Sequence, residues 1–87
     1  MKVTFRDQSL EHYNEWALFD RKTFLKITKL LDQITRSPFE GEGKPEALRG
    51  NLSGMWSRRI NQKDRIVYKV HENEIEVFSF KGHYDEK

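Results

Sequence analysis

Hydrophobic side chains recur along residues 9–36 at intervals of three or four positions, which is the period of an amphipathic helix. Two helices are predicted there. The first, capped by Asp7 or Ser9, is expected to turn inward a face made of Leu10, Tyr13, Trp16 and Ala17. The second, capped by Asp20, carries a stripe of Phe24, Ile27, Leu30, Leu31 and Ile34. Because proline disfavours the helical conformation of the residue before it, the second helix should end at about Arg36 or Ser37, before Pro38.

The remaining hydrophobic positions alternate with polar ones, which is the period of a β-strand. Short strands are predicted at residues 2–5, 55–60, 65–70 and 75–80, and turns at 61–64 and 71–74 join the last three into an antiparallel meander. Residues 41–54 contain four glycines and are predicted to form a loop with a brief extended stretch around Leu48. Within residues 65–70, alternation points Arg65 away from the side that carries Tyr68.

The order of these elements, one strand, two helices and then strands, predicts an α+β fold. We expect two N-terminal helices packed on one face of a small antiparallel-rich β-sheet, in a single domain spanning residues 1–87. A mean hydropathy of −0.89 and the absence of any apolar run near the ~20 residues that a membrane span requires predict a soluble, cytoplasmic protein. The absence of cysteine excludes disulfide frameworks, thiolate nucleophiles and cysteine-type zinc sites.

The net charge of +2 is distributed unevenly along the sequence. Residues 1–43 contain seven basic and seven acidic side chains, residues 44–69 contain seven basic and two acidic ones, and residues 70–87 contain two basic and five acidic ones. A middle segment with a net charge of +5 is typical of a surface that meets phosphate. The alternative is a solvated strand face whose cations only keep the protein in solution.

Several classes of catalytic site find no support in the sequence. The three histidines, His12, His71 and His83, lie far apart and show no metal-ligand spacing, so we expect neither a metal nor another cofactor. No G-x-S-x-G motif is present, and the glycine-containing stretch 41–44 matches neither the dinucleotide-binding nor the Walker pattern.

Cations and aromatic residues are interleaved in the second half of the chain, a combination with which proteins hold RNA. These residues are Lys44, Arg49, Trp56, Arg58, Arg59, Arg65 and Tyr68, followed by His83 and Tyr84. Trp56 and Tyr68 could instead pack into the core. Arg58 and Arg59 are adjacent in a strand and face opposite sides, so only one of them is expected to enter a given site.

Metal-free cleavage of RNA needs a base for the attacking 2′-hydroxyl, a cation for the phosphorane and an acid for the leaving 5′-oxygen. The chain offers one candidate for each, namely Glu46, Arg65 and His83. The alternative for His83 is a solvent-exposed histidine near the chain end.

Four ordered motifs resemble a known family. They are S-P-F-E-G-E-G-K-P-E-A-L at 37–48, N-L-S-G-M-W-S-R-R-I at 51–60, D-R-I-V-Y at 64–68 and His83-Tyr84. The combination resembles the YoeB/Txe toxins of the RelE superfamily, which are ribosome-dependent mRNA interferases. The resemblance covers nearly the whole chain and implies a RelE-like fold and endonucleolytic cleavage of mRNA in the ribosomal A site. Two departures are Arg49-Gly50 before N-L-S-G, and Asp85-Glu86-Lys87 after His83-Tyr84.

The resemblance also implies site residues and partners. It assigns Glu46 as general base, Arg65 as the phosphate-stabilising cation, His83 as general acid and Tyr84 as an aromatic helper. Positions that would bind RNA or phosphate are Lys44, Arg49, Arg58 and Arg59. The implied partners are a YefM-like antitoxin, mRNA and the bacterial ribosome, and homodimerisation stays open. The competing hypothesis is a non-catalytic basic module that binds RNA or the ribosome.

Overall fold

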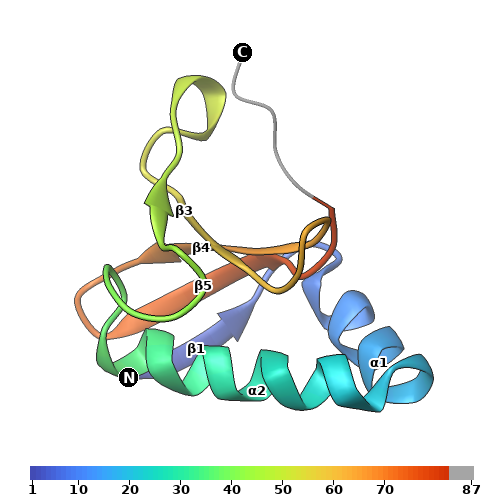
Figure 1. The fold of residues 1–87 in the computed structure, drawn as a ribbon. Helices are drawn as coiled ribbons and strands as arrows, with labels where there is room; N and C mark the ends of the chain where they lie inside the picture. The colour runs from blue at the N-terminus through green and yellow to red at the C-terminus, as the bar shows by residue number, and fades with distance from the viewer. Residues whose placement is uncertain (83–87) are drawn as a thin grey trace.

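The structure is a computed structural model, and it describes residues 1–82. Its elements, in chain order, are β1 (Lys2–Phe5), α1 (Ser9–Phe19), α2 (Arg21–Arg36), β2 (Glu46–Ala47), the 3₁₀ turn η1 (Gly50–Leu52), β3 (Trp56–Arg59), β4 (Arg65–Val70) and β5 (Glu74–Ser79). The two helices follow β1 directly and the other strands come after them, as the sequence predicts (Figure 1).

The strands form one five-stranded sheet in the order β1-β5-β4-β3-β2. The meander β3-β4-β5 and the short β2 pair antiparallel, which confirms the predicted antiparallel-rich sheet. β1 pairs parallel with β5, so the first strand lies beside the last. Alternation predicted the strand at residues 2–5 but not its neighbour, because strand periodicity carries no information about the partner.

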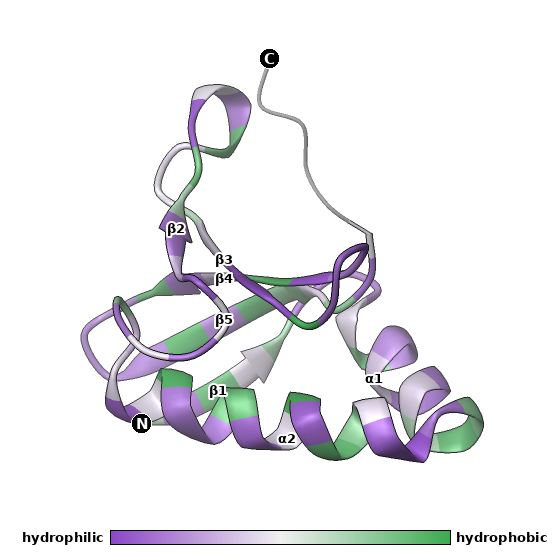
Figure 2. Ribbon diagram, viewed as in Figure 1, coloured by the Kyte–Doolittle hydropathy of each residue, from purple (hydrophilic) through white to green (hydrophobic). Residues whose placement is uncertain are grey.

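Both helices pack on the same face of the sheet, as predicted (Figures 1 and 2). Ile27, Leu30 and Ile34 of α2 are fully buried in one cluster with side chains of the sheet and the segment after it. Those partners are Ile60, Ile66, Tyr68, Ile75, Val77 and Phe80. No helix among residues 1–82 is long and apolar enough to cross a membrane.

The face that α1 buries differs from the predicted one. Tyr13 and Trp16 pack against the core, whereas Leu10 is 52% exposed and Ala17 is also exposed. At about 100° per residue, Tyr13 and Trp16 share a side with the fully buried Ser9, while Leu10 and Ala17 fall roughly a quarter-turn away. The prediction that Leu10 and Ala17 face inward was wrong because spacing alone left the centre of the buried face undetermined.

The boundaries of α2 follow from local chemistry. The Asp20 side chain accepts hydrogen bonds from the Thr23 amide at 3.1 Å and the Thr23 hydroxyl at 2.8 Å, which confirms the predicted cap. These bonds lower the pKa of the Asp20 carboxyl. α2 ends at Arg36, as predicted, whereas α1 begins after Gln8 without a side-chain cap, so the predicted cap at Asp7 or Ser9 was wrong.

Candidate functional site

Three of the candidate site residues lie on the sheet face opposite the helices, here called the open face. In β3, Trp56 packs against the core and alternation sends Ser57 and Arg59 to the other side. The register pairs Ser57 with Glu46 of β2 and Arg59 with Arg65 of β4. Residues paired across antiparallel strands share a face, so Glu46, Arg59 and Arg65 all belong to the open face.

The pairing of Arg59 with Arg65 is electrostatically unusual. Like charges directly opposite each other in a sheet are destabilising. Within the described residues, all side-chain hydrogen bonds of Arg65 come from Nη1, which reaches the carbonyls of Asn61 at 3.0 Å, Gln62 at 3.4 Å and Asp64 at 3.2 Å. Nε and Nη2 of Arg65 therefore have no partner in residues 1–82. Two opposed guanidinium groups that keep N–H donors without a partner in residues 1–82 are suited to binding an anion between them.

Glu46 occupies the other side of this arrangement. It is exposed in β2, two strands away from β4, so about 10 Å separates the strand axes that carry Glu46 and Arg65. A separation of this size leaves room for a ribose and its phosphate to lie between an acidic and a basic side chain.

The prediction that Arg65 points away from the Tyr68 side is confirmed, since Tyr68 is in the helix-facing core.

The glycine-containing loop before β2 holds Lys44 beside Arg59. The Gly43 carbonyl accepts a hydrogen bond from the Arg59 amide at 2.6 Å. Gly43 has φ +87°, and a Cβ there would lie 2.9 Å from the Arg59 carbonyl oxygen, so only glycine permits this approach. Lys44 itself has φ +50°, which shows that the loop continues in an uncommon conformation. The backbone conformation of the loop therefore fixes the position of Lys44 beside Arg59.

Arg58 has a different role from the one predicted. Its side chain is fully buried, and its guanidinium donates to the carbonyls of Ser37, of Glu40 at 2.7 Å and of Glu42 at 3.2 Å. The expectation that Arg58 grips RNA is wrong for this structure, because a guanidinium with no exposed surface cannot reach a phosphate. Arg59 is exposed, so one arginine of the pair faces the surface, as alternation requires.

Tyr68 completes the anchoring of the loop that Arg58 holds. Its hydroxyl donates to the Pro38 carbonyl at 2.6 Å and accepts from Arg58 Nε at 3.4 Å. Burial raises the pKa of this phenol. The alternative reading of Tyr68 as a core residue is therefore the correct one, and Trp56 packs against the core as well, 4.8 Å from the Phe39 ring.

A hollow of about 360 Å³ continues the basic surface around the end of β3. Its charged lining residues are Lys26, Glu42, Lys44 and Arg59. The sequence reasoning missed Lys26 because it counted residues 1–43 as electrically neutral. A signal was present, since Lys22, Lys26 and Lys29 are spaced i, i+4, i+7 along α2 and so share one helix face.

The remaining predicted site residues lie beyond this group. Arg49 is exposed immediately before η1, in the segment that projects from the sheet away from the helices (Figure 1). His83 and Tyr84 lie outside the described residues. The residue before them, Gly82, accepts a hydrogen bond through its carbonyl from the Arg65 amide at 2.9 Å. Among residues 1–82, no group of three or more histidine or carboxylate side chains could hold a metal ion.

Comparison with known proteins identifies the family. Residues 5–84 match the YoeB-like toxin of bacterial type II toxin-antitoxin systems. The toxin YoeB of Streptomyces coelicolor is 44% identical over 84 residues, which is 97% of this chain and all of that protein.

Solved structures agree with the sequence comparison. The YoeB/ParE toxin from Agrobacterium tumefaciens superposes with a TM-score of 0.92 at 38% identity, over 97% of this chain and 100% of that one. Staphylococcus aureus YoeB, solved in a heterotetrameric complex with YefM and as a dimer, gives TM-scores of 0.88 and 0.89 at 45% identity, over 97% of this chain and 98% of that one. The chain therefore belongs to the YoeB-like toxins of bacterial type II toxin-antitoxin systems and has the RelE/YoeB-like fold.

Proposed function

We propose that this toxin is an endoribonuclease that cleaves mRNA in the A site of the bacterial ribosome without a metal. The observation that carries the proposal is the shared open face of Glu46, Arg59 and Arg65, with the two arginines directly opposed across β3 and β4. This group combines a carboxylate with two cations at the spacing of a nucleotide. Action on the ribosome implies the cytoplasm as the site of action.

The proposed reaction is an attack by the RNA on its own backbone. Glu46 removes the proton of the 2′-hydroxyl, whose oxygen then bonds to the adjacent phosphorus. Arg65 and Arg59 stabilise the negative charge of the phosphorane. The bond from phosphorus to the 5′-oxygen breaks, and His83 donates a proton to that oxygen. The products are a 2′,3′-cyclic phosphate and a free 5′-hydroxyl, and Tyr84 assists as the aromatic helper that the family resemblance assigns.

RNA binding is assigned to the cations that surround this group. Lys44 and Arg49 are retained from the sequence prediction because both are exposed. Lys26 is added because it lines the hollow that Lys44 and Arg59 also line. Arg58 is left out, since its guanidinium is buried and already bonded to three carbonyls. Phosphate contacts of this kind would hold mRNA or ribosomal RNA without reading its sequence.

The partners proposed for the toxin are an antitoxin and a second copy of itself. The Staphylococcus aureus relative was solved with YefM and as a dimer. We propose a YefM-like antitoxin that covers the basic open face with an acidic or extended segment, which would neutralise the toxin in its own cell. Charge complementarity should accelerate their association at low salt. The dimer is proposed as an assembly of the free toxin.

A non-catalytic RNA-binding or ribosome-binding module would carry the same positive surface. The two functions separate when purified protein is incubated with programmed ribosomes and, in parallel, with the same mRNA free in solution, followed by mapping of 5′ ends. The proposed function predicts new 5′ ends within the A-site codon in the ribosome sample only. Binding to ribosomes without any new 5′ end would favour the non-catalytic module, and cleavage of free mRNA at the same rate would remove the requirement for the ribosome.

A further inference from the structure

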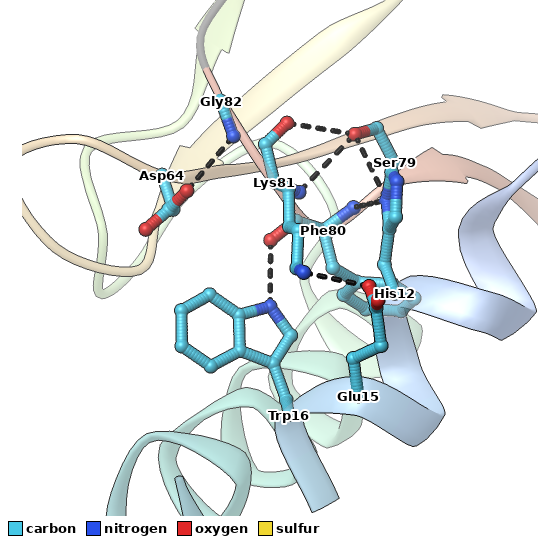
Figure 3. Close-up of polar contacts among 8 residues, drawn as sticks. All are labelled: His12, Glu15, Trp16, Asp64, Ser79, Phe80, Lys81 and Gly82. Atoms are coloured by element: carbon cyan, nitrogen blue, oxygen red, sulfur yellow. Dashed lines mark hydrogen bonds and ion pairs between the residues drawn. The ribbon is translucent and has the colours of Figure 1, made fainter. Parts of the chain in front are cut away.

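The segment from Ser79 to Gly82 is held by hydrogen bonds to α1 and to the β3–β4 turn (Figure 3). Within the segment, Ser79 Oγ accepts from the Lys81 amide at 3.2 Å and donates to the Lys81 carbonyl at 2.9 Å. His12 Nδ1 accepts a hydrogen bond from the Phe80 amide at 3.2 Å, and Trp16 Nε1 donates to the Phe80 carbonyl at 3.0 Å. A backbone amide can only donate, so Nδ1 of His12 carries no proton in this contact. Two residues of α1 therefore hold both polar groups of Phe80.

The side chains on either side of this contact reinforce it. The Phe80 ring lies 5.6 Å from the ring of Phe5 and 5.4 Å from that of Tyr13, inside the core. Lys81 Nζ forms an ion pair with Glu15 of α1 at 2.6 Å and lies 5.9 Å from the centre of the Trp16 ring. This partner lowers the pKa of the Glu15 carboxyl. The segment is thus attached to α1 up to Lys81.

The next residue, Gly82, is attached to the opposite side, the β3–β4 turn. Asp64 Oδ1 accepts a hydrogen bond from the Gly82 amide at 2.8 Å, and the Gly82 carbonyl accepts one from the Arg65 amide at 2.9 Å. Gly82 has φ +72° with open space where a Cβ would be, so glycine is needed there for its backbone conformation and not for lack of room.

Asp64 is held in place for this contact. The residue is only 9% exposed. The turn that carries it is closed by Asn61 Oδ1, which accepts from the amides of Lys63 at 2.8 Å and Asp64 at 2.7 Å. A carboxylate this buried requires donors. Among residues 1–82, the hydrogen-bond donor to the Asp64 side chain is the Gly82 amide.

We propose that Asp64 is a positioning residue: it fixes Gly82 against the strand that carries Arg65, and proton donation by His83, which is bonded to Gly82, depends on this attachment. One peptide bond joins Gly82 to His83, and Asp64 is adjacent in sequence to Arg65. Phosphate stabilisation by Arg65 and proton donation by His83 would in this way both depend on the β3–β4 turn. The inference rests on the proposed function, in which His83 is the general acid.

The first test compares three variants in single-turnover cleavage of mRNA on programmed ribosomes. Asp64→Ala is expected to lower kcat about tenfold or more with KM unchanged, since a small displacement of a reacting group costs this much. Asp64→Asn keeps an acceptor for the Gly82 amide and should retain a rate near wild type. Asp32→Ala, an exposed aspartate of α2, is the matched control and should not change the rate. An unchanged kcat in folded Asp64→Ala would overturn the inference.

A double-mutant cycle with His83→Ala separates positioning from a general structural effect. If Asp64 acts through residue 83, Asp64→Ala should produce no further loss in the His83→Ala background. A full tenfold loss there would overturn the inference. Failure of the proposed function has a different signature, a wild-type rate for His83→Ala alone.

Amide hydrogen exchange tests the tether without activity. The Gly82 amide should lose at least tenfold protection in Asp64→Ala and keep its protection in Asp64→Asn and Asp32→Ala. Equal protection in all four proteins would overturn the inference. If Asp64→Ala does not fold, Asp64→Ser, whose hydroxyl is too short to reach the Gly82 amide, takes its place in each of these measurements.

Discussion

Arg58 and Arg59 are consecutive residues of β3 with opposite environments. Strand alternation sends Arg58 into the helix-facing side, where backbone carbonyls surround its guanidinium, and leaves Arg59 on the open face. A guanidinium can saturate several carbonyls at once because it has five donors in a fixed plane. The same residue type therefore stabilises a loop on one face and, in the proposed function, supplies positive charge for RNA on the other.

Exchanging each of these arginines for methionine should separate the two roles. Arg58→Met leaves the carbonyls of Ser37, Glu40 and Glu42 without their donor, and we expect a loss of about 3 kcal/mol in the free energy of unfolding. Arg59→Met should change it by less than about 0.5 kcal/mol while lowering cleavage. Urea denaturation measures the free energy of unfolding of both variants. Equal stabilities would contradict the structural assignment of Arg58.

Arg65 and His83 are predicted to act in the chemical step. Arg65→Ala and His83→Ala should each reduce cleavage on ribosomes by a factor of about 10² or more, because removal of transition-state charge stabilisation or of a general acid has effects of this size. The Arg65 guanidinium bonds only to turn carbonyls among the described residues, so that variant should unfold cooperatively close to the wild-type temperature. Cleavage at the wild-type rate by either variant would remove that residue from the mechanism.

At the scale of elements, α2 is the helix whose form depends most clearly on its own sequence. Its buried stripe repeats with helical period, Asp20 caps its first turn, and its last residue, Arg36, precedes Ser37-Pro38. α1 lacks a side-chain cap and is held instead by packing of Tyr13 and Trp16 on the sheet. Helices of this length are marginal alone, so α1 depends on the tertiary structure more than α2 does.

The Asp20 cap gives a pH-dependent prediction. The folded-state pKa of Asp20 is lowered by its hydrogen bonds with Thr23, so its contribution to stability is present above the unfolded pKa and is lost as pH falls through the folded value. Asp20→Ala should lower Tm by a few degrees at neutral pH. The difference in Tm from wild type should shrink as pH falls below the ordinary aspartate pKa of about 3.9 toward the lowered pKa of the folded state.

Asp20→Asn is the matched control, because asparagine caps helices about as well without a charge. The Tm of Asp20→Asn should stay close to that of wild type at neutral pH and remain above that of Asp20→Ala in acid. A Tm difference between wild type and Asp20→Ala that does not depend on pH would show that the carboxylate charge contributes nothing to the cap.

The sequence predicted the elements well and their mutual placement less well. Periodicity located α2 and the meander because both depend on nearby residues. It could not supply the parallel neighbour of β1, which is 70 or more positions away in the chain, since Lys2 pairs with Glu74. It also could not say which of Arg58 and Arg59 faces inward.

The candidate site shows the same division. The chemistry of metal-free RNA cleavage and the family resemblance selected Glu46 and Arg65, and the strand register then placed both on one face of the sheet. Lys26 entered the site only through the packing of α2 beside the loop that carries Lys44. Asp64 is part of the motif at 64–68, but the sequence assigned it no role because its partner, the Gly82 backbone amide, has no side chain that a sequence pattern could reveal. The assignments of His83 and Tyr84 stay predictions, since both lie outside the described residues.

At the scale of the whole molecule, the uneven charge of the sequence becomes an uneven charge across the sheet. The basic residues 44–69 include β2, β3 and β4, which form one side, whereas β5 and β1 form the other. There Glu74 accepts from the Thr4 hydroxyl, and hydrogen bonds from His71 and Arg6 lower the pKa of Glu76. The carboxylates of Glu74 and Glu76 are thus hydrogen-bonded within their own side of the sheet, while Arg59 and Lys44 on the other side remain available to a ligand.

This asymmetry predicts how ribosome binding should depend on salt. Each phosphate contact releases condensed counterions, so the logarithm of the binding constant falls linearly with the logarithm of salt concentration. Replacing Lys44 and Arg59 by glutamine should reduce the magnitude of that slope by about 1 per residue. The measurement uses programmed ribosomes and the His83→Ala background, which keeps the mRNA intact.

The matched control replaces Lys2, on the edge strand farthest from β2, and Arg21, at the start of α2, by glutamine. Both double variants lose two positive charges, so they have the same net charge and differ only in where the charge was removed. If the basic side of the sheet contacts phosphate, the control keeps the wild-type slope while Lys44→Gln with Arg59→Gln flattens it. Equal slopes for the two double variants would mean that only net charge matters, and the open face would then lose its assignment as the RNA-binding surface.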